Sequence, residues 1–587
     1  MLKNIIALWS YLGKKRRIQF FLLFVLMLIS VFAEIVSIGA VIPFLSALTK
    51  PELLMELTWM QPVISTLGIQ SADELLLPLT LGFVIAAVFS AGVRILLLWA
   101  NGRLTAAMGV QLRSEVYTRT LYQSYEFHVA HNSSQLISMV TEKVGAAIHV
   151  GIMHVLMLIS ALFMSIAIIS TLLLINTQVA VLAFVTLGGG YVLTGYLTRK
   201  QIRRNGNIIA QNQPQAIKCM QEGLGGIRDI IMDNSQSVFS RLYTQVARNM
   251  EMAGMQNGFL SNLPKSLLEM LGITLIAASA YWLQINSAGQ QAAIPVLGAL
   301  ALGAQRLLPT LQQIYFSWSV INGNQAALIA VTNQLAYPLS SMVNDHKHFS
   351  PLAFHNSLRL QNVHFCYAGI DTPVLKDINL NITKGSRVGF IGTTGSGKST
   401  LLDIVMGLLS PTQGRLIVDD VIIDKHNVSA WQRNIAHVPQ SIFLSDTSMA
   451  ENVAFGVPLE EIDLAQVKRA AEHAQIAGFI EELAEGYQTP VGERGVRLSG
   501  GQRQRIGIAR ALYKQASVII FDEATSALDN ATEAGVMEAI NSLDKNLTLI
   551  IVAHRLSTLK KCDVIYQLNN GCISQSGSYE QIVKVAA

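Results

Sequence analysis

Charged residues are scarce in this chain of 587 residues: Asp, Glu, Lys and Arg make up only 14% of it, whereas hydrophobic residues make up 51%. An ordinary globular protein carries about 25% charged residues, so the composition argues against a wholly soluble protein. Disorder is excluded, because a disordered chain contains few apolar residues. The chain has only four cysteines and no CxxC pair, which excludes a disulfide scaffold and a cysteine metal site. The net charge of +5 does not by itself indicate a nucleic-acid partner, and we expect none.

The apolar residues are concentrated before about residue 330, in six long runs. These runs cover residues 18–48, 75–100, 144–175, 179–197, 260–283 and 293–314. A helix needs about 20 mainly apolar residues to cross a bilayer, and the buried helices of a soluble protein would not produce six runs of this length. We therefore predict an all-α membrane domain with six spans over residues 1–336.

Lysine and arginine residues flank these runs on one side. Four basic residues stand at 14–17, before the first run, and others lie between the second and third runs and between the fourth and fifth. The remaining loops hold almost none. Because loops on the cytoplasmic side are rich in Lys and Arg, the N-terminus and the segment after the sixth run are predicted to be cytoplasmic. The first run is too long for a signal peptide and lacks a small-residue cleavage site.

The two inside loops, residues 101–143 and 198–259, keep a helical pattern, so spans two to five are predicted to continue as helices beyond the membrane. Turns are expected near 122–134 and 223–233. Outside, an apolar stripe at helical spacing over 51–68 predicts a short amphipathic helix on the outer membrane face. A packed loop is the alternative. The stripe consists of Leu53, Leu57, Met60, Ile64 and Leu67.

After residue 330 the character of the sequence changes. Residues 337–357 are polar and read as a linker, and residues 358–587 alternate short Val/Ile strands with helical stretches. This alternation is typical of an α/β domain with a largely parallel sheet. The fold class predicted for the whole chain is therefore a helical membrane domain followed by an α/β domain.

A glycine-rich loop follows the apolar strand at 388–391 and precedes an apolar helix. Its pattern is GxxxxGK[ST], in which backbone N–H groups and the helix N-terminus surround phosphate oxygens. Lys398 is predicted to reach the β and γ phosphates of ATP, and the Ser399 hydroxyl to ligate Mg²⁺. The predicted nucleotide-binding residues of the loop are Gly392, Thr393, Thr394, Gly395, Ser396, Gly397, Lys398, Ser399 and Thr400.

A second apolar strand, at 518–522, ends in two acidic residues. Asp522 suits Mg²⁺, directly or through water, and Glu523 suits polarisation of the attacking water. Together, the glycine-rich loop and this acidic strand end predict an ATP hydrolase rather than an ordinary glycine turn.

Between these two motifs stands Leu498-Ser-Gly-Gly-Gln, and with it residues 358–587 resemble the nucleotide-binding domain of ATP-binding cassette (ABC) transporters. The six runs ahead of this domain resemble an exporter-type half-transporter. The resemblance implies an aromatic contact of Tyr367 with adenine, and contacts of Gln440 with Mg²⁺ and the membrane domain. It also implies a D-loop at Asp529 and a switch histidine, His554, at the γ-phosphate.

In that family two cassettes pair head to tail, and ATP lies between the phosphate loop of one and LSGGQ of the other. The corresponding residues here are Ser499, Gly500, Gly501 and Gln502. Their hydroxyl and backbone N–H groups would offer donors to the γ-phosphate from the far side. Because every element is intact in this chain, we predict a homodimer.

Five charged residues lie within the apolar runs: Glu34, Arg94, Lys265, Glu269 and Arg306. Such charges are costly in a membrane and usually face a cavity. The three cations would suit an anionic head group such as a pyrophosphate. The alternative is neutralisation within the protein: Lys265 and Glu269 stand four residues apart and could pair, and Arg94 could extend to the membrane surface.

A second resemblance concerns the transported substrate. Glu34 with Pro43-Phe44, Lys265 with Glu269, and Arg306 with Pro309 resemble the bacterial flippase of lipid-linked oligosaccharides in protein N-glycosylation. Lysine at 265, where that family is expected to have arginine, is a departure. The resemblance implies ATP-driven flipping of a polyprenyl-pyrophosphate-linked saccharide across a bacterial inner membrane. Export of a peptide or an amphipathic small molecule is the alternative, whereas the six runs exclude a non-transporting ATPase.

Overall fold

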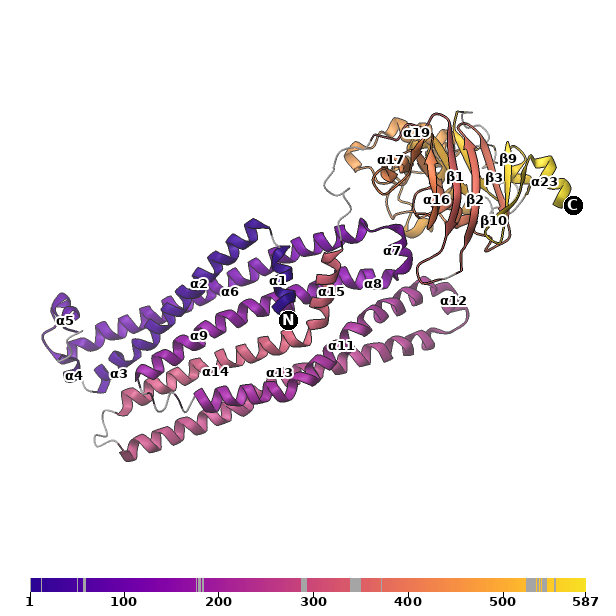
Figure 1. Cartoon of the computed structure of the whole chain (residues 1–587). Coiled ribbons are helices and arrows are strands. Elements are labelled where there is room, and N and C mark those ends of the chain that lie inside the picture. The colour runs from indigo at the N-terminus through magenta and orange to yellow at the C-terminus, as the bar shows by residue number, and fades with distance from the viewer. Residues whose placement is uncertain are drawn as a thin grey trace. The chain divides into compact units, whose positions relative to one another are not determined.

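The structure is a computed structural model that describes residues 1–587 except 1, 12, 50, 56–59, 176, 178–180, 182–183, 287–292, 338–349, 371, 524–534, 536–537, 539, 541–545, 554–555 and 587. The chain divides into two compact units. One comprises Met1–Gln123 and Phe127–Val343, and the other comprises Ser124–Glu126 and Asn344–Ala587. The first is built of helices, and the second contains all the strands of the described residues (Figure 1).

Long helices dominate the first part of the chain. In order, the helices are α1 (Leu2–Ser10), α2 (Lys14–Gly39), α3 (Val41–Thr49), α4 (Pro51–Met55), α5 (Gln61–Leu67), α6 (Leu76–Leu121), α7 (Tyr125–Ala130), α8 (Ser133–Ser138), α9 (Met153–Ile175), α11 (Gly189–Gly225), α12 (Ile227–Met232), α13 (Gln236–Asn286), α14 (Ala293–Gly323) and α15 (Gln325–Ala336). Segments of π-helix at Met139–Lys143 and Ala146–Ile152 lead into α9, and another at Phe184–Gly188 leads into α11.

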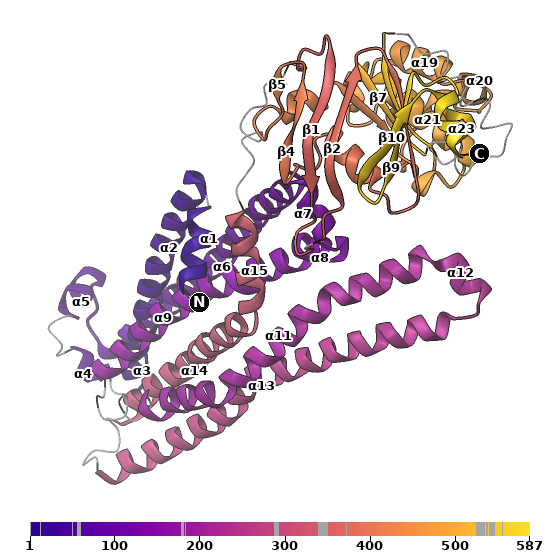
Figure 2. The same cartoon turned by 45° about the vertical axis from the view of Figure 1, so that its right-hand side comes forward.

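Several of these helices are longer than a bilayer requires. Helix α6 has 46 residues and α13 has 51. At 1.5 Å per residue these helices are about 69 Å and about 77 Å long, against a hydrocarbon core of about 30 Å. Helices α11 and α13 lie side by side and are joined by the short α12 (Figure 2). The helical continuation and the turn near 223–233 are therefore as the sequence predicted.

Three helical segments of the described residues are long and apolar enough to cross a membrane: Lys14–Leu48, Leu76–Leu121 and Ser133–Leu174. They cover the first three predicted runs except residues 75 and 175. Of the others, 260–283 lies within α13, 293–314 lies within α14 and 179–197 lies partly within α11. That these last three runs also span the membrane stays a prediction.

Where the sequence predicted one outer helix, the structure has two short helices, α4 and α5, on either side of residues 56–59. Leu57 of the predicted stripe lies outside the described residues. Leu54 and Met60 are buried and pack with Ala47 and Leu75. Met60, which the predicted stripe placed toward lipid, therefore packs inside the protein. The apolar side chains at the ends of α3 and α6 provide a surface that removes it from water.

The second unit contains two sheets. The first is antiparallel, in the order β2-β1-β4-β5, and the second has the order β10-β9-β3-β8-β7-β6 and is parallel except at β10. The strands are β1 (Ser357–Phe365), β2 (Leu375–Thr383), β3 (Arg387–Gly392), β4 (Gln413–Val418), β5 (Val421–Ile422), β6 (Ile435–Val438), β7 (Val518–Asp522), β8 (Thr548–Val552), β9 (Val564–Asn569) and β10 (Cys572–Gly577). The parallel sheet confirms the predicted α/β class, and the separate antiparallel sheet is an addition to it.

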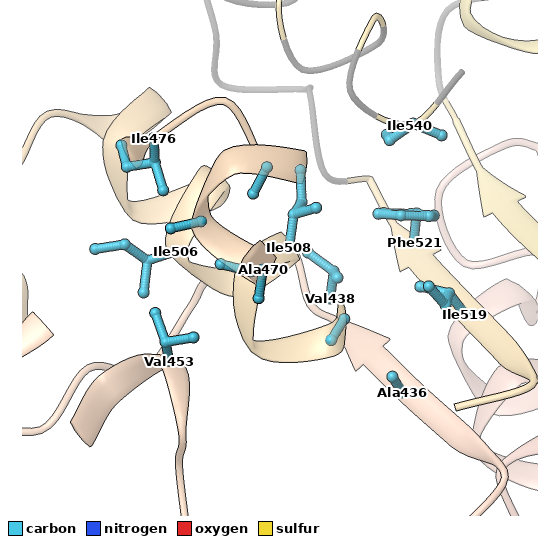
Figure 3. Close-up of a cluster of buried hydrophobic side chains, with 14 of the residues drawn as sticks. Ala436, Val438, Val453, Ala470, Ile476, Ile506, Ile508, Ile519, Phe521 and Ile540 are labelled. Atoms are coloured by element: carbon cyan, nitrogen blue, oxygen red, sulfur yellow. The ribbon is translucent and has the colours of Figure 1, made fainter. Parts of the chain in front are cut away.

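Helices cover the parallel sheet. They include α16 (Lys398–Val405), α17 (Val428–Gln432), α18 (Met449–Val453), α19 (Leu464–His473), α20 (Ala477–Glu481), α21 (Gly500–Tyr513) and α23 (Tyr579–Ala586). Strand β7 is an unbroken apolar run because both of its faces are buried. Phe521 of β7 and Val438 of β6 belong to one buried cluster with Ile508 of α21, Val453 of α18 and Ala470 of α19 (Figure 3). This core fixes the end of β7, where the two acidic residues stand.

Arg119, in the last turn of α6, joins three elements of the first unit. Its Nη1 donates hydrogen bonds to the carbonyl oxygens of Leu335 at 2.6 Å and Tyr337 at 2.8 Å, at the end of α15. Its Nε pairs with Glu115 at 2.8 Å, and the guanidinium lies 5.3 Å from the ring centre of Tyr11. The last carbonyls of a helix have no partner within it, so Arg119 supplies donors where α15 ends.

Replacement of Arg119 by alanine should lower the thermal stability of the purified protein. The substitution removes charge-assisted hydrogen bonds worth about 1.5–3 kcal/mol each and leaves the carbonyl of Leu335 without that donor. Arg103→Ala is the matched control, because its guanidinium packs over the Trp99 ring on the same helix. Tryptophan fluorescence recorded on heating gives the melting temperatures of the two variants and of the parental protein. Equal melting temperatures for the two variants would show that Arg119 does not hold α15.

Candidate functional site

The glycine-rich loop connects β3 to α16 as predicted. Gly395 and Gly397 have φ angles of 82° and 100°, in the left-handed region. A Cβ atom at Gly397 would lie 2.8 Å from Cδ2 of Leu375. Gly397 is therefore required both for its backbone conformation and for the space beside β2. The loop closes on itself ahead of α16, where the backbone N–H of Ser396 donates to the carbonyl of Thr393 at 3.1 Å.

Lys398 begins α16 and is only 7% exposed. Its Nζ donates to the carbonyl oxygens of Gly392 at 2.8 Å and Thr393 at 3.0 Å. The Ser396 hydroxyl is buried and has no hydrogen-bond partner among the described residues. A buried ammonium group and an unpaired hydroxyl beside a helix N-terminus fit a phosphate group.

A cavity of about 230 Å³ opens beside this loop. It is lined by Val374, Thr394, Gly395, Gly397, Lys398, Ser399, Thr400 and Glu523. The structure thus brings the phosphate loop and the acidic end of β7 together, although they stand far apart in the sequence. Val374 is a lining residue that the sequence analysis missed, because an aliphatic residue ahead of a strand carries no distinctive signal.

Glu523 follows the last residue of β7 and has a φ of 49°. This left-handed conformation costs a non-glycine residue about 1–3 kcal/mol and often marks a functional site. The backbone N–H of Glu523 donates to the carbonyl of Val552 at 3.0 Å. Its Oε2 accepts a hydrogen bond from Nε2 of Gln440 at 2.8 Å. Two predicted site residues from different loops therefore meet at the cavity.

Negative charge accumulates at the end of β7. Burial raises the pKa of the Asp522 carboxyl, the neighbouring Glu523 raises it further, and Lys398 opposes the shift. Burial, followed by the charge of Asp522, raises the pKa of Asp403 in α16 to about 6. Asp403 was not among the predicted residues, although a single acid in the apolar helix after the loop was a visible signal. These acids lack sufficient positive charge, so oxygen ligands are available to a cation.

The oxygen groups here fit Mg²⁺, which prefers one or two protein oxygens together with phosphates and water. Ser399 lines the cavity beside the loop, and Asp522 immediately precedes Glu523. Within the described residues, no group of three or more His, Cys, Asp or Glu side chains could hold a metal by itself. The phosphates of a nucleotide would have to complete the ligand set.

Tyr367 lies close to the loop without lining the cavity. Its hydroxyl is 3.1 Å from Oγ1 of Thr400, and its ring packs edge-on against Phe365 with centroids 4.9 Å apart. These contacts hold the ring near the start of α16. The predicted contact of Tyr367 with adenine stays a proposal.

Ser499 is the N-cap of α21. Its hydroxyl accepts from the backbone N–H of Gln502 at 3.2 Å, and Oε1 of Gln502 accepts from the backbone N–H of Ser499 at 2.8 Å. This capping box leaves the N–H groups of Gly500 and Gly501 at a helix N-terminus, where the helix dipole favours an anion. None of these four residues lines the cavity of the same chain. Asp529 and His554 lie outside the described residues.

Three of the intramembrane charges form one cluster. Glu34 of α2 pairs with Arg94 of α6 and with Arg306 of α14, each at 2.9 Å. Oε2 of Glu34 also accepts a hydrogen bond from the Ser90 hydroxyl at 2.7 Å. The charge of Arg94 is thus paired with a carboxylate of the protein, which argues against the alternative in which it only extends to the membrane surface.

This cluster borders a cavity of about 470 Å³ in the membrane unit. The lining residues are Glu34, Arg94, Met164, Ile168, Gln305, Arg306, Pro309 and Thr310. Lys265 and Glu269 are exposed on α13, do not line the cavity, and form no ion pair with each other among the described residues. The structure therefore brings together three of the four candidate substrate residues, Glu34, Arg94 and Arg306, and leaves Lys265 outside the cavity lining.

Comparison with known proteins identifies the family. The family model of the ABC transporter transmembrane region matches residues 18–300, and the model of the ABC transporter itself matches residues 375–526. The chain is 30% identical over 478 residues to the ATP-dependent lipid A-core flippase of Saccharophagus degradans, covering 80% of this chain and 79% of that one. The chain therefore belongs to the ABC transporter family.

Two further comparisons cover nearly the whole chain. The heterocyst differentiation ATP-binding protein HepA of a Nostoc species is 28% identical over 562 residues, which is 94% of this chain and 89% of that one. The solved structure of a bacterial Atm1-family ABC exporter with ATP bound has a TM-score of 0.77 at 22% identity and covers 97% of this chain. The fold is that of an ABC exporter half-transporter. The protein is an ATP-driven exporter in which an ATPase domain is coupled to transport.

The raised pKa of Asp403 predicts a pH-dependent stability. The folded state favours the protonated carboxyl, so this contribution is complete below the ordinary value of 3.8 and is lost as the pH rises through about 6. Asp403→Asn should therefore raise the melting temperature at pH 7.5, and should raise it less at pH 5.

Asp420→Asn is the control, because its side chain is 98% exposed. Thermal unfolding of the nucleotide-free protein at the two pH values gives the comparison. A gain of the same size at both pH values would show that the charge of Asp403 is not its cause.

Proposed function

We propose that this exporter is a homodimeric flippase that moves a polyprenyl-pyrophosphate-linked saccharide from the inner to the outer leaflet of a bacterial inner membrane. The observation that carries the proposal is the pair Arg94 and Arg306 beside one cavity of the membrane unit. Guanidinium groups are well suited to phosphate groups, because their donors match phosphate oxygens in pairs. The relatives named as lipid A-core flippases support a lipid substrate in general.

The ATP chemistry is assigned to the residues around the phosphate loop. Backbone N–H groups of the loop and Lys398 bind the phosphates, while Ser399, Asp522 and Gln440 hold Mg²⁺. When bound there, Mg²⁺ would supply positive charge that offsets the negative charge developing on the phosphates. Glu523 accepts a proton from the attacking water, and its hydrogen bond to Gln440 orients the carboxylate. His554 and Asp529 are assigned to the γ-phosphate and to the dimer contact on the family resemblance alone.

The homodimer is supported by the separation of two donor groups within one chain. The N-terminus of α21, with Ser499, Gly500 and Gly501, does not line the cavity that contains Lys398. A second copy placed head to tail would bring this helix N-terminus to the phosphates from the other side. We place the N-terminus and the cassette in the cytoplasm, because the basic residues at 14–17 and in the long loops mark that side.

Lys265 does not line the cavity, so the proposed headgroup contact is restricted to Arg94 and Arg306, with Glu34 between them. Met164, Ile168 and Pro309 supply an apolar part of the lining. That part favours the second candidate function, export of a peptide or an amphipathic small molecule. The paired arginines favour an anionic substrate over a neutral one.

Glu523→Gln should bind ATP and hydrolyse it at least about a hundredfold more slowly. The amide keeps the shape of the side chain but cannot accept the proton, and loss of such a base typically reduces rates by about 10²–10⁴-fold. Phosphate release and nucleotide binding by the purified protein measure the two effects. Glu460→Gln, at an exposed glutamate of the same domain, is the control. Parental turnover in Glu523→Gln would refute the role of Glu523.

Arg306→Ala and Arg94→Ala should each slow the transport of a labelled polyprenyl-pyrophosphate glycan in reconstituted vesicles, and leave basal ATP hydrolysis largely intact. Each variant removes one of the two cations that bind the headgroup. Arg103→Ala, on α6 outside the cavity lining, controls for loss of positive charge. If both cavity variants move this lipid at the parental rate, the peptide or small-molecule exporter becomes the better explanation.

A further inference from the structure

The carboxylate of Glu34 lies between the two arginines of the membrane cavity. Its Oε1 is 2.9 Å from Nη1 of Arg306, and its Oε2 is 2.9 Å from Nη2 of Arg94. The Ser90 hydroxyl donates a third contact, to Oε2 at 2.7 Å. Every oxygen of this carboxylate is therefore engaged by a positively charged or hydroxyl donor.

Burial differs sharply within the cluster. The side chain of Glu34 is 3% exposed, whereas those of Arg94 and Arg306 are 49% and 28% exposed. A guanidinium group has five N–H donors, and the recorded contacts with Glu34 use one nitrogen of each arginine. Within the part of the chain that the structure describes, no further partner of these two guanidinium groups is found, so their other donors stay available at the cavity, which the nearly buried Glu34 also lines.

The charge balance follows from these contacts. One carboxylate cancels one of the two positive charges, so the cluster presents a net charge of about +1 rather than +2 to an entering group. An anionic group that binds the arginines comes close to the buried carboxylate that they share. The repulsion between these two anions is strong because apolar surroundings screen it weakly. Glu34 therefore opposes the binding that Arg94 and Arg306 favour.

We propose that Glu34 is an internal counter-ion that competes with a diphosphate headgroup for Arg94 and Arg306, and so weakens its binding enough for release. The inference rests on the proposed function, because it takes the substrate to be a lipid with an anionic headgroup. A transporter needs a site that binds strongly enough to load and weakly enough to unload. The cluster meets both needs with three side chains from α2, α6 and α14.

The test is the affinity of the full-length protein in lipid nanodiscs for farnesyl diphosphate, with farnesol as the neutral probe. ATP without Mg²⁺ is present throughout, so that the probe does not occupy the nucleotide site. Glu34→Gln should bind farnesyl diphosphate about tenfold more tightly than the parental protein and bind farnesol equally. Inorganic pyrophosphate should show the same gain if the headgroup alone is recognised.

Glu269→Gln is the matched control, because Glu269 is an intramembrane glutamate on α13 that does not line the cavity. Glu34→Asp serves as a second variant if the glutamine variant does not fold. Its shorter side chain cannot bridge both arginines, so a smaller gain in affinity is expected. A carboxylate that only held the helices together would give the opposite result, weaker binding in both variants.

The outcomes separate the two levels of the proposal. If the parental protein prefers farnesyl diphosphate to farnesol but the Glu34 variants bind it no more tightly, the role of Glu34 is wrong and the proposed function stands. If the parental protein does not prefer the diphosphate at all, the proposed function fails, and the role of Glu34 fails with it.

Discussion

A charge that leaves water for apolar surroundings loses hydration energy and must find a partner there. This constraint acts in both units of the protein. In the membrane unit, Glu34 meets it by pairing with Arg94 and Arg306. In the cassette, Lys398 meets it by donating to the carbonyls of its own loop. Both clusters border cavities, where an anionic ligand could exchange for the internal partners.

The two clusters differ in the sign of the charge that is left uncompensated. At the end of β7, the carboxyl groups of Asp522 and Glu523 stand close together beside the ammonium of Lys398, so acidic groups outnumber the cation. Burial is the main cause of the raised pKa of Asp522, and the charge of Glu523 adds to it. A divalent cation would offset that excess, because carboxylate and hydroxyl oxygens are ligands that Mg²⁺ prefers. In the membrane cavity two arginines share one carboxylate, so positive charge is in excess and an anion corrects it. The direction of each imbalance indicates the charge of the ligand that we assign to it.

The phosphate loop and its place between β3 and α16 could be predicted from the sequence, because their geometry is local. The loop from Gly392 to Lys398 is fixed by residue spacing, and the strand before it by an unbroken apolar run. The contact between Glu523 and Gln440 was predictable only through the family resemblance. The residues of the membrane cluster were predicted but their pairing was not, because the contact of Glu34 with Arg306 depends on how α2 and α14 are rotated toward each other. Hydrophobic runs do not encode that rotation. For the same reason, the apolar stripe over 51–68 did not predict that Met60 packs inside the protein.

The central claim is that ATP hydrolysis moves a lipid with an anionic headgroup across the bilayer. The most direct measurement follows the leaflet position of two lipids in sealed vesicles that contain the purified protein, one a polyprenyl-pyrophosphate glycan and one a neutral glycolipid with the same glycan. The account predicts movement of the anionic lipid that requires both ATP and Mg²⁺, and little movement of the neutral one. Equal rates for the two lipids, or vigorous ATP hydrolysis with neither lipid moving, would contradict it.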